Sequence, residues 1–365
     1  MLLALNMAYL TFNRTMLRHN YQYLKNLFGN ENIEWAIVTK LLCGEEKLLK
    51  EVIDLGIKEV CDARIINLKR IKALAPDDLE TVYIKPPAKK AIPDLVRYAD
   101  TSFNSEFETI KAISEEAVKQ NKTHKIIIMI ELGDLREGVM GEDLMDFYSS
   151  VFRLPNIKVT GIGSNLNCLH GVMPSQDKFI QLSLYKQLIE AKFNVSIPWI
   201  TGGTSVVIPL LEMRQLPQGV NHFRVGETLY FGTDLIHNNG FKEMEQNVIT
   251  LYTQIIEITE KPMLPIGEME ANPQGETFEV DESLYGKTSH RAILDVGSLD
   301  ISSDYLVPFP EYQIDFLGAS SDMLVIDIKD NKKGYKVGDF IPFHLKYMGA
   351  LTLFNSDYIE KRVID

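Results

Sequence analysis

The chain has 365 residues, of which 45% are hydrophobic and 24% are charged, values that are ordinary for a globular protein of one large or two medium domains. Its formal net charge of -12 disfavours a nucleic-acid or anionic-membrane partner, because either would need a basic stripe. The three cysteines are far apart and form no CxxC pair, which disfavours disulfides or a zinc site and predicts a cytoplasmic protein.

The first ten residues, MLLALNMAYL, are apolar but lack the basic region and the small-residue cleavage site of a signal peptide. They are too short to span a membrane, although they could form a β-strand, and either Met1 or Met7 could be the true start. No apolar run elsewhere in the sequence approaches ~18 residues, so we expect no membrane segment.

Short apolar runs then alternate with amphipathic stretches. A helix is expected over 13–28, where Leu17, Tyr21, Leu24 and Phe28 share one face. Eight strands are expected, at 35–39, 59–62, 81–84, 101–104, 125–132, 157–162, 197–200 and 223–225. Helices are expected between them, at 45–55, 65–74, 89–98, 106–120, 142–152 and 177–193, with another beginning near Ser205. Alternating strands and helices imply a parallel sheet, and eight such units predict a closed (β/α)₈ barrel of the TIM type.

The pattern changes after Gly232. Runs such as NVITLYTQIIEI, RAILDVGS, DMLVIDI and DFIPFHL are typical of strands, and no long amphipathic helices separate them. We therefore predict an α/β protein with two domains. The barrel would span 13–236, and a mainly β domain would comprise residues 237–365 together with residues 1–12.

Functional residues of such a barrel lie at the C-terminal ends of its strands. The candidates there are, in strand order, Lys40, Arg136 in ELGDLREGVMG, Asn165 and His170 in GIGSNLNCLHG, the segment TGGTS at 201–205, and Arg224 in FRVGE. Each motif alone has a plainer explanation. Lys40 could be a solvated lysine at the rim of the barrel, and TGGTS could be a loop with a helix cap. The two arginines could form salt bridges, and His170 could be structural. The seven histidines show no HxH or HExxH spacing, so we expect no metal site.

The combination of these motifs is more specific than any one of them. GGTS at the opening of a helix exposes backbone N–H groups and a hydroxyl, and the helix dipole favours an anion there. The loops after strands seven and eight of such barrels commonly bind phosphate. A phosphate at that place, an arginine on strand eight and a lysine on strand one together describe a pyridoxal phosphate site, in which the lysine forms the Schiff base.

The motifs VTKLLCG, DLREG, GIGSNLNC, GGTS and RVGE resemble those of the ornithine-racemase-type branch of the alanine racemase superfamily, the fold type III pyridoxal phosphate enzymes. The resemblance continues through KPMLPIGE, LGASSDMLVID and LKYMGALTLFNSDYIEK and so spans nearly the whole chain in order. It implies an alanine-racemase-like fold, pyridoxal 5'-phosphate as cofactor and a free amino acid as substrate. It also implies a head-to-tail homodimer, in which the β domain of each subunit completes the active site of its partner.

The resemblance also implies roles for individual residues. Lys40 would be the Schiff-base lysine, and Arg136 would approach the cofactor's phenolic oxygen and the substrate carboxylate. Asn165 would stand against the ring, where alanine racemases place a histidine, and Arg224 would face the pyridine nitrogen. The phosphate would be held by Gly203, Thr204, Ser205, Gly226, Glu227 and, from the β domain, Tyr347. Because arginine stays protonated at ordinary pH, it cannot accept a proton from the ring nitrogen, and a neutral ring suits racemisation better than transamination.

Racemisation needs one acid–base group on each face of the substrate Cα, and Lys40 can serve one face. The tyrosine that serves the other face in alanine racemases, in an SYG-like motif, is absent here, where the sequence reads PIGE. The candidates for the second group are Ser321 and Asp322 of ASSD, with Ser298 as a further one. Ser298 and Leu299 also stand where the branch is expected to carry larger polar side chains, so the substrate stays open.

We therefore expect a pyridoxal-phosphate-dependent amino-acid racemase that acts on ornithine, lysine or an alanine-like substrate by a two-base mechanism. A basic substrate would need carboxylates, which Glu227, Glu268, Asp300 and Asp322 could supply. One alternative is a non-catalytic pyridoxal phosphate homeostasis protein, against which the second domain argues. Another is a different fold type III enzyme, such as a decarboxylase or a D-amino-acid aldolase. The sequence shows neither the cysteine–aspartate signature of the decarboxylases nor a metal-ligand pair.

Overall fold

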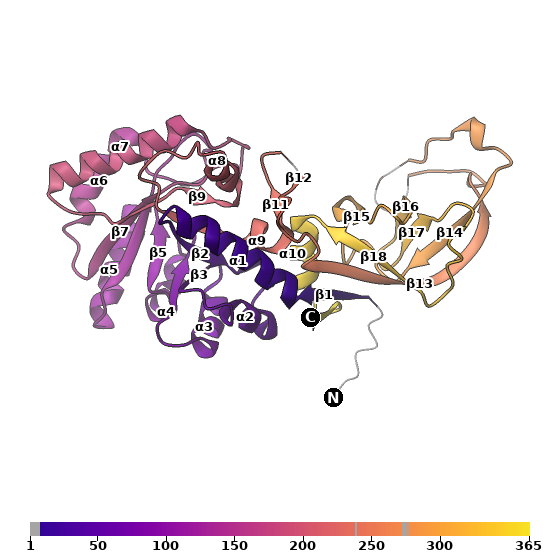
Figure 1. The fold of residues 1–365 in the computed structure, drawn as a ribbon, viewed down its shortest axis with the longest axis horizontal. Coiled ribbons are helices and arrows are strands. Elements are labelled where there is room, and N and C mark those ends of the chain that lie inside the picture. The colour runs from indigo at the N-terminus through magenta and orange to yellow at the C-terminus, as the bar shows by residue number, and fades with distance from the viewer. Residues whose placement is uncertain (1–7, 238, 272–274, 276) are drawn as a thin grey trace. The chain divides into compact units, whose positions relative to one another are not determined.

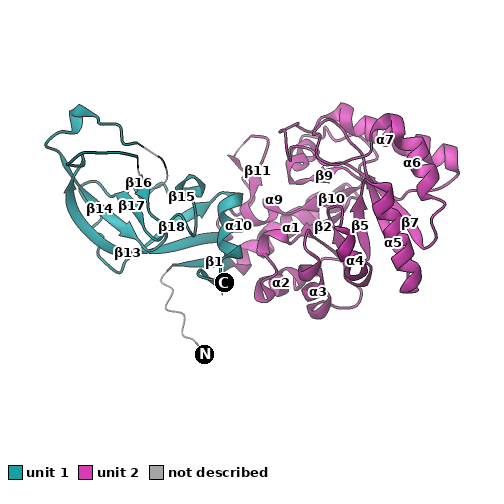
Figure 2. Ribbon diagram, turned by 180° about the vertical axis from the view of Figure 1, so that it is seen from behind, with its two compact units in different colours: residues 1–12, 249–364 teal, residues 13–248, 365 magenta. Residues whose placement is uncertain are grey.

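A computed structural model describes residues 8–237, 239–271, 275 and 277–365. The described chain divides into two compact units (Figures 1 and 2). One unit runs from Asn13 to Val248, past the expected boundary at residue 236, and also takes in Asp365. The other joins the residues up to Phe12 with Ile249–Ile364.

The first unit is built around a parallel sheet of nine strands, in the order β8-β7-β6-β5-β4-β3-β2-β10-β9. Only Gly202 separates β8 from β9, and these two short strands pair with β7 and β10 respectively, so together they occupy one position of the barrel. The predicted (β/α)₈ barrel is therefore confirmed. The strands are β2 (Glu34–Val38), β3 (Glu59–Asp62), β4 (Glu80–Tyr83), β5 (Thr101–Asn104), β6 (His124–Met129), β7 (Ile157–Gly163), β8 (Trp199–Thr201), β9 (Gly203–Thr204) and β10 (His222–Val225).

Helices alternate with the strands, and all but the last of them lie at the expected places. They are α1 (Arg14–Asn30), α2 (Glu46–Ile53), α3 (Ile65–Leu74), α4 (Ile92–Tyr98), α5 (Phe107–Lys119), α6 (Leu144–Val151), α7 (Gln176–Phe193), α8 (Ile208–Glu212) and α9 (Glu227–Phe231). The α-helices α4 and α6 begin later than predicted, because a single 3₁₀ turn occupies their expected first residues. Helix α1 begins where the Asn13 side chain accepts a hydrogen bond from the Met16 amide, and it buries Leu17, Leu24 and Phe28 as its spacing predicts.

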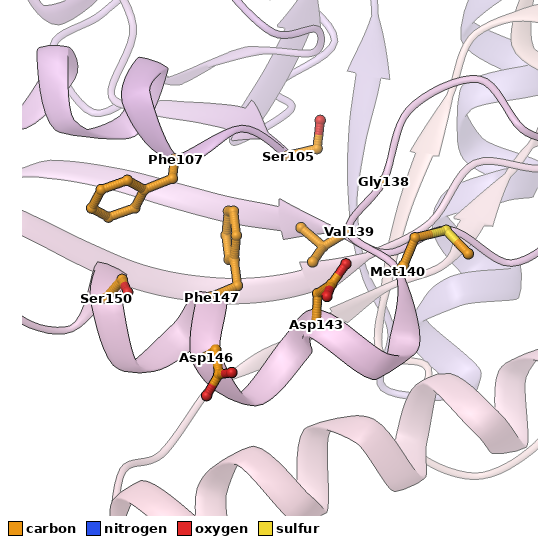
Figure 3. A pocket seen from close by; sticks show the side chains of 9 residues that line it. All are labelled: Ser105, Phe107, Gly138, Val139, Met140, Asp143, Asp146, Phe147 and Ser150. Atoms are coloured by element: carbon orange, nitrogen blue, oxygen red, sulfur yellow. The ribbon is translucent and has the colours of Figure 1, made fainter.

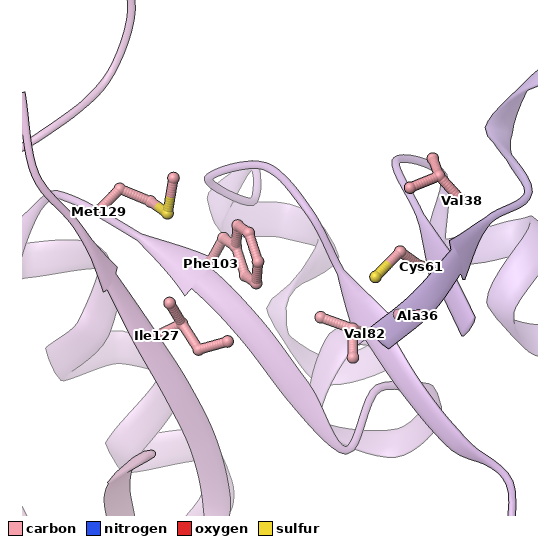
Figure 4. Packing of buried hydrophobic residues seen from close by; sticks show 7 residues of the cluster. All are labelled: Ala36, Val38, Cys61, Val82, Phe103, Ile127 and Met129. Atoms are coloured by element: carbon pink, nitrogen blue, oxygen red, sulfur yellow. The ribbon is translucent and has the colours of Figure 1, made fainter. Parts of the chain in front are cut away.

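Apolar side chains from five neighbouring strands fill one side of the barrel interior (Figure 4). The cluster consists of Ala36, Val38, Cys61, Val82, Phe103, Ile127 and Met129. Glycines make room on β7, where a Cβ on Gly161 would lie 3.3 Å from the Trp199 side chain and a Cβ on Gly163 would lie 2.8 Å from the Thr201 side chain. Close packing therefore requires glycine at both positions of the GIG run of β7, the strand that leads into the loop with Asn165.

The second unit is an antiparallel sheet with the strand order β15-β18-β13-β14-β17-β16, and β1 pairs with both β13 and β19. The strands are β1 (Tyr9–Asn13), β13 (Ile249–Pro262), β14 (Thr288–Leu294), β15 (Leu306–Pro308), β16 (Asp315–Ala319), β17 (Leu324–Asp327), β18 (Phe340–Leu345) and β19 (Glu360–Ile364), with helix α10 (Tyr347–Asn355) between the last two. The mainly β domain and the strand before residue 13 are confirmed, and residues 1–7 lie outside the described part. The hairpin β11 (Thr233–Asp234) and β12 (Asn239–Gly240) belongs to the barrel unit.

Candidate active site

Lys40 is the first residue of the 3₁₀ turn that follows β2, at the C-terminal end of the barrel strands. Its side chain is exposed, but both flanks are fixed. On one side the buried Thr39 donates a hydrogen bond to Asp62 Oδ2 at 2.9 Å. On the other side Leu41 and Leu42 are buried in the core. The amine therefore projects from a rigid segment at the mouth of the barrel.

The loop after β10 lies beside the lysine strand. Strand β10 runs parallel to β2 with Val225 opposite Ile37, and a Cβ on Gly226 would lie 3.1 Å from Val38 Cβ. The amides of Gly226 and Thr228 converge on Ser205 Oγ, to which they donate hydrogen bonds at 3.3 Å and 3.2 Å. Two backbone donors and a hydroxyl thus meet at one point, as a phosphate site requires.

Glu227 connects this loop to the lysine. Burial raises the pKa of the Glu227 carboxyl, and the positive charge of Lys40 acts on the same pKa in the opposite direction. An interaction of this kind requires the two groups to be near each other. The lysine turn and the loop with the converging amides are therefore parts of one site.

Arg224 is the most completely bound side chain of the site. It is only 4% exposed, and its Cζ lies 5.1 Å from the centroid of the Phe103 ring. Nη1 donates to both the carbonyl and the hydroxyl of Thr201, and Nη2 donates to the Ser164 carbonyl at 3.0 Å and to Asn165 Oδ1 at 2.7 Å. These bonds use four of the five N–H donors of the guanidinium. Burial lowers the pKa of Arg224 to about 10, so the group stays charged at neutral pH.

Asn165 and Glu137 link Arg224 to Arg136. The Asn165 amide donates to Glu137 Oε1 at 2.5 Å. The same carboxylate accepts from Arg136, through Nη2 at 2.7 Å and through Nε. The hydrogen bond to Glu137 is the main reason why the pKa of Arg136 is raised. The structure thus brings three of the predicted residues into one hydrogen-bonded series and adds Glu137, which the sequence analysis did not single out.

A second carboxylate, Asp134, holds the loop that carries Asn165. Asp134 is 2% exposed, and its oxygens accept the backbone amides of four residues of that loop, namely Cys168, Leu169, His170 and Val172. His170 Nδ1 lies 2.8 Å from the Asp134 carbonyl oxygen, so this histidine contributes to the loop structure.

Gly203 and Thr204 form β9, and packing also requires glycine in the TGGTS segment. A Cβ on Gly203 would lie 2.3 Å from the Phe223 ring, and one on Gly202 would lie 2.7 Å from the Phe179 ring. The two glycines therefore owe part of their role to the closure of the barrel.

The remaining predicted residues lie in the β unit. Tyr347 is the first residue of α10, whereas Ser298, Ser321 and Asp322 lie in two adjoining loops. The Ser298 amide donates to the Ser320 carbonyl at 2.8 Å, and Ser321 Oγ donates to Asp322 Oδ2 at 2.5 Å. The second-base candidates are therefore neighbours within this unit.

A groove of about 510 Å³ opens between the N-terminal end of α5 and the length of α6 (Figure 3). It is lined by Ser105, Phe107, Gly138, Val139, Met140, Asp143, Asp146, Phe147 and Ser150, and none of the predicted site residues is among them. In the described part of the chain, no group of three or more His, Cys, Asp or Glu side chains could hold a metal ion. None of the helices described is long and apolar enough to cross a membrane.

Comparison with known proteins identifies the family. Residues 13–234 match the model of the alanine racemase N-terminal domain. The chain is also 36% identical over 358 residues to an ornithine racemase from Acetoanaerobium sticklandii, an alignment that covers 97% of this chain and 99% of that protein. The chain belongs to the alanine racemase family. A lysine racemase from Thermotoga maritima is 29% identical over 353 residues, which covers 96% of this chain and 97% of that protein.

Solved structures confirm the fold of this alanine racemase family member. An alanine racemase from Bartonella henselae with covalently bound pyridoxal phosphate superposes with a TM-score of 0.75 at 16% identity, covering 98% of this chain and 99% of that one. With the family and these relatives established, the chain is a pyridoxal-phosphate-dependent amino-acid racemase. The predicted family, cofactor and class of reaction are confirmed.

Proposed function

We propose that this racemase interconverts the L and D forms of a basic amino acid, ornithine or lysine, and that it works as a head-to-tail homodimer in the cytoplasm. The observation that carries the choice of substrate is the near full-length similarity to an ornithine racemase and a lysine racemase. Three free cysteines, of which Cys168 is exposed, agree with a reducing compartment.

The residues at the mouth of the barrel fit pyridoxal phosphate. Ser205 Oγ and the amides of Gly226 and Thr228 already converge and would bind the phosphate, to which Gly203, Thr204, Glu227 and Tyr347 are expected to contribute. The Lys40 amine would bind the aldehyde. Among the described residues, no partner is found for the Nε–H of Arg224, so this donor would face the ring nitrogen. When bound, the cofactor withdraws electrons from the substrate and makes its Cα proton acidic.

The chain itself supplies the proton transfers and the orientation. Lys40 would take up or return the Cα proton on one face. On the opposite face we assign this task to Ser321 and Asp322 from the partner subunit's β unit, because the Ser321 hydroxyl is already hydrogen-bonded to a carboxylate that can accept its proton. Arg136, held by Glu137, would bind the substrate carboxylate.

A basic side chain of the substrate requires a negative group at the far end of the pocket. Among the four carboxylates that the sequence offers, Asp300 and Asp322 lie in adjoining loops and interact electrostatically. Burial is the main reason why the pKa of Asp300 is raised, and Asp322 raises it further. A cationic substrate group would stabilise Asp300 in its charged form and leave Asp322 to its role beside Ser321, which favours ornithine or lysine over alanine.

Exchange of the Cα proton with solvent deuterium tests the proposal directly. We expect purified enzyme loaded with pyridoxal phosphate to exchange the proton of ornithine or lysine faster than that of alanine, serine or glutamate, with both enantiomers formed on chiral chromatography. Replacement of Lys40 by alanine should lower the rate at least about 1,000-fold, because the proton-transfer group on one face is lost. Replacement of Lys47, an exposed lysine of α2, by alanine should leave it unchanged. Preferential exchange of alanine would refute the proposed substrate.

A further inference from the structure

Four buried polar side chains form a continuous hydrogen-bonded series through the interior of the barrel. Glu59 Oε1 lies 3.1 Å from His222 Nε2, and His222 Nδ1 lies 2.7 Å from Thr201 Oγ1. Thr201 Oγ1 in turn accepts from Nη1 of Arg224. Their exposed fractions are 8% for Glu59, 0% for His222 and Thr201, and 4% for Arg224. The series therefore runs, out of contact with bulk water, from a carboxylate to the guanidinium of the active site.

The alternation of side chains along the strands brings these groups together. His222 and Arg224 are two residues apart on β10 and so face the same side. Glu59 shares a face of β3 with Cys61, a member of the interior cluster. Thr201 ends β8, and Trp199 on the same face stacks on the His222 ring with the centroids 4.7 Å apart. The polar series thus replaces apolar side chains that normally fill such a barrel.

The guanidinium fixes the direction of the first hydrogen bond of the series. It can only donate, so Thr201 Oγ1 accepts from Arg224, and we assign the proton of the hydroxyl to the hydrogen bond with His222 Nδ1. An imidazole that accepts at Nδ1 carries its proton at Nε2, from which it donates to the Glu59 carboxylate. In this assignment each hydrogen bond has one donor and one acceptor.

We propose that Glu59, His222 and Thr201 are positioning residues, which fix the orientation of the Arg224 guanidinium from inside the barrel and pass the polarising effect of a buried carboxylate to it. The part that concerns the ring nitrogen rests on the proposed role of Arg224. Thr201 supplies two of the four oxygens that Arg224 contacts, its hydroxyl and its carbonyl. With those N–H groups engaged, only Nε–H remains to meet the cofactor.

Burying a carboxylate, an imidazole and a hydroxyl in the barrel interior costs more free energy than filling the same space with apolar side chains. Replacement of buried polar groups by well-packed apolar side chains is often neutral or stabilising. If the series served packing alone, valine at position 201 would serve as well as threonine, because the two side chains have nearly the same shape. A positioning role predicts instead that valine disturbs Arg224 and that serine, which keeps the hydroxyl, does not.

The first experiment measures the tautomer of His222 by ¹⁵N nuclear magnetic resonance of the holoenzyme labelled at histidine, with His222→Gln to assign the signals. At pH 7.5 we expect a neutral ring protonated at Nε2. Thr201→Val should shift the Nδ1 signal, and Thr160→Val, a matched substitution on β7 outside the series, should not. A ring protonated at Nδ1 would overturn the proposal.

The second experiment measures the cofactor. Thr201→Val should raise the dissociation constant of pyridoxal phosphate about ten-fold, the effect of losing a hydrogen bond to a charged group. It should also raise the ratio of transamination to racemisation, whereas Thr201→Ser and Thr160→Val keep both values within about two-fold. If Thr201→Val matches the wild type in both, the positioning role is refuted. If the wild type binds the cofactor but racemises no basic amino acid, the proposed substrate fails, while the tautomer and the cofactor affinity still test the series.

Discussion

The two arginines of the site illustrate two ways to hold a positive charge. Arg136 is partly exposed and directly paired with the Glu137 carboxylate. Arg224 is buried, and its hydrogen bonds go to neutral oxygens, those of Thr201, Ser164 and Asn165. Burial lowers the pKa of Arg224 to about 10, which still leaves it protonated at neutral pH. In its proposed role at the ring nitrogen, a guanidinium that stays protonated cannot accept a proton from the ring, which suits racemisation better than transamination.

Replacement of Glu137 by glutamine tests the link between these arginines. The amide loses the charge that holds Arg136 and can no longer accept from both Arg136 and Asn165 at the same strength. Steady-state kinetics should show KM for the amino acid raised about ten-fold, with a smaller fall in kcat. Glu142→Gln, on the exposed turn that follows, is the matched control. An unchanged KM would contradict the assignment of Arg136 to the substrate carboxylate.

The buried His124 should make the free energy of unfolding depend on pH. This residue is 2% exposed, with Nε2 2.8 Å from Ser102 Oγ, and burial lowers its pKa to about 4. The unfolded chain therefore binds a proton at higher pH than the folded chain does. As pH falls from about 6.5 to about 4, stability should decrease by up to about 3 kcal/mol. Urea unfolding of the wild type and of His124→Gln across this pH range measures the effect, and the variant should lose less unfolding free energy than the wild type. His19→Gln changes an exposed histidine and is the control, which should behave like the wild type.

At this scale the sequence predicted the residues that end strands but not those that meet across the barrel. Lys40, Arg136, Asn165 and Arg224 follow from their positions after apolar runs. The alternation of side chains along β10 places His222 on the same face as Arg224. It does not show that Glu59 Oε1 lies 3.1 Å from His222 Nε2. That contact depends on the closure of the barrel and on the tilt of its strands, which no local pattern specifies.

At the scale of elements, the loop between β7 and α7 shows how an irregular segment is made rigid. Asp134 accepts four backbone amides from it and thereby supplies the hydrogen bonds that a regular element would give. Burial alone would raise the pKa of Asp134, but the amides of Leu169, Val172, Cys168 and His170 outweigh it and lower the pKa. The stabilisation is therefore present above the ordinary pKa of an aspartate and is lost as pH falls through the lowered value.

Replacement of Asp134 by alanine should cost about 3 kcal/mol of unfolding free energy, because several amide donors of the loop lose their acceptor. Asn165 should become mobile with the loop, so kcat/KM should fall along with stability. Urea denaturation and kinetics measure the two effects, and Asp143→Ala, at an exposed position of the groove in Figure 3, is the control. A stable variant with normal kinetics would show that the loop is held by other contacts.

The number and order of barrel elements were predictable from apolar periodicity, whereas their exact ends were not. Pro93 and Pro209 stand at the first or second position of α4 and α8, where proline is tolerated. The preceding 3₁₀ turns shorten both α-helices, and a turn of this kind has the same composition as a first helical turn. The seventh barrel position is divided into β8 and β9 at Gly202, where a Cβ would lie 2.7 Å from the Phe179 ring, a close approach that only the tertiary structure reveals.

At the scale of the whole molecule, the proposed chemistry needs both units. The barrel carries Lys40 and the residues that fit the cofactor, whereas Ser321 and Asp322 lie in the β unit. Residues 265–268, which replace the tyrosine-bearing motif of alanine racemases, include Ile266 with 92% of its surface exposed. The sequence could show that the tyrosine is absent, but not which side chain replaces it, because in the proposed dimer that depends on how the two subunits are arranged.

Mixed dimers test whether each active site uses both subunits. The Lys40→Ala variant and the double variant Ser321→Ala with Asp322→Asn should each be inactive as a homodimer. After the two are mixed and their subunits exchanged, half of the dimers are mixed, and each has one site that combines an intact Lys40 with intact Ser321 and Asp322. Chiral chromatography should therefore recover about a quarter of wild-type activity. Mixing Lys40→Ala with a Ser105→Ala control, which keeps an intact site, should give about half of wild-type activity whether or not subunits exchange, and so checks that the mixing procedure itself costs no activity. If no activity returns although mass spectrometry shows mixed dimers, the partner's loops do not supply the second base.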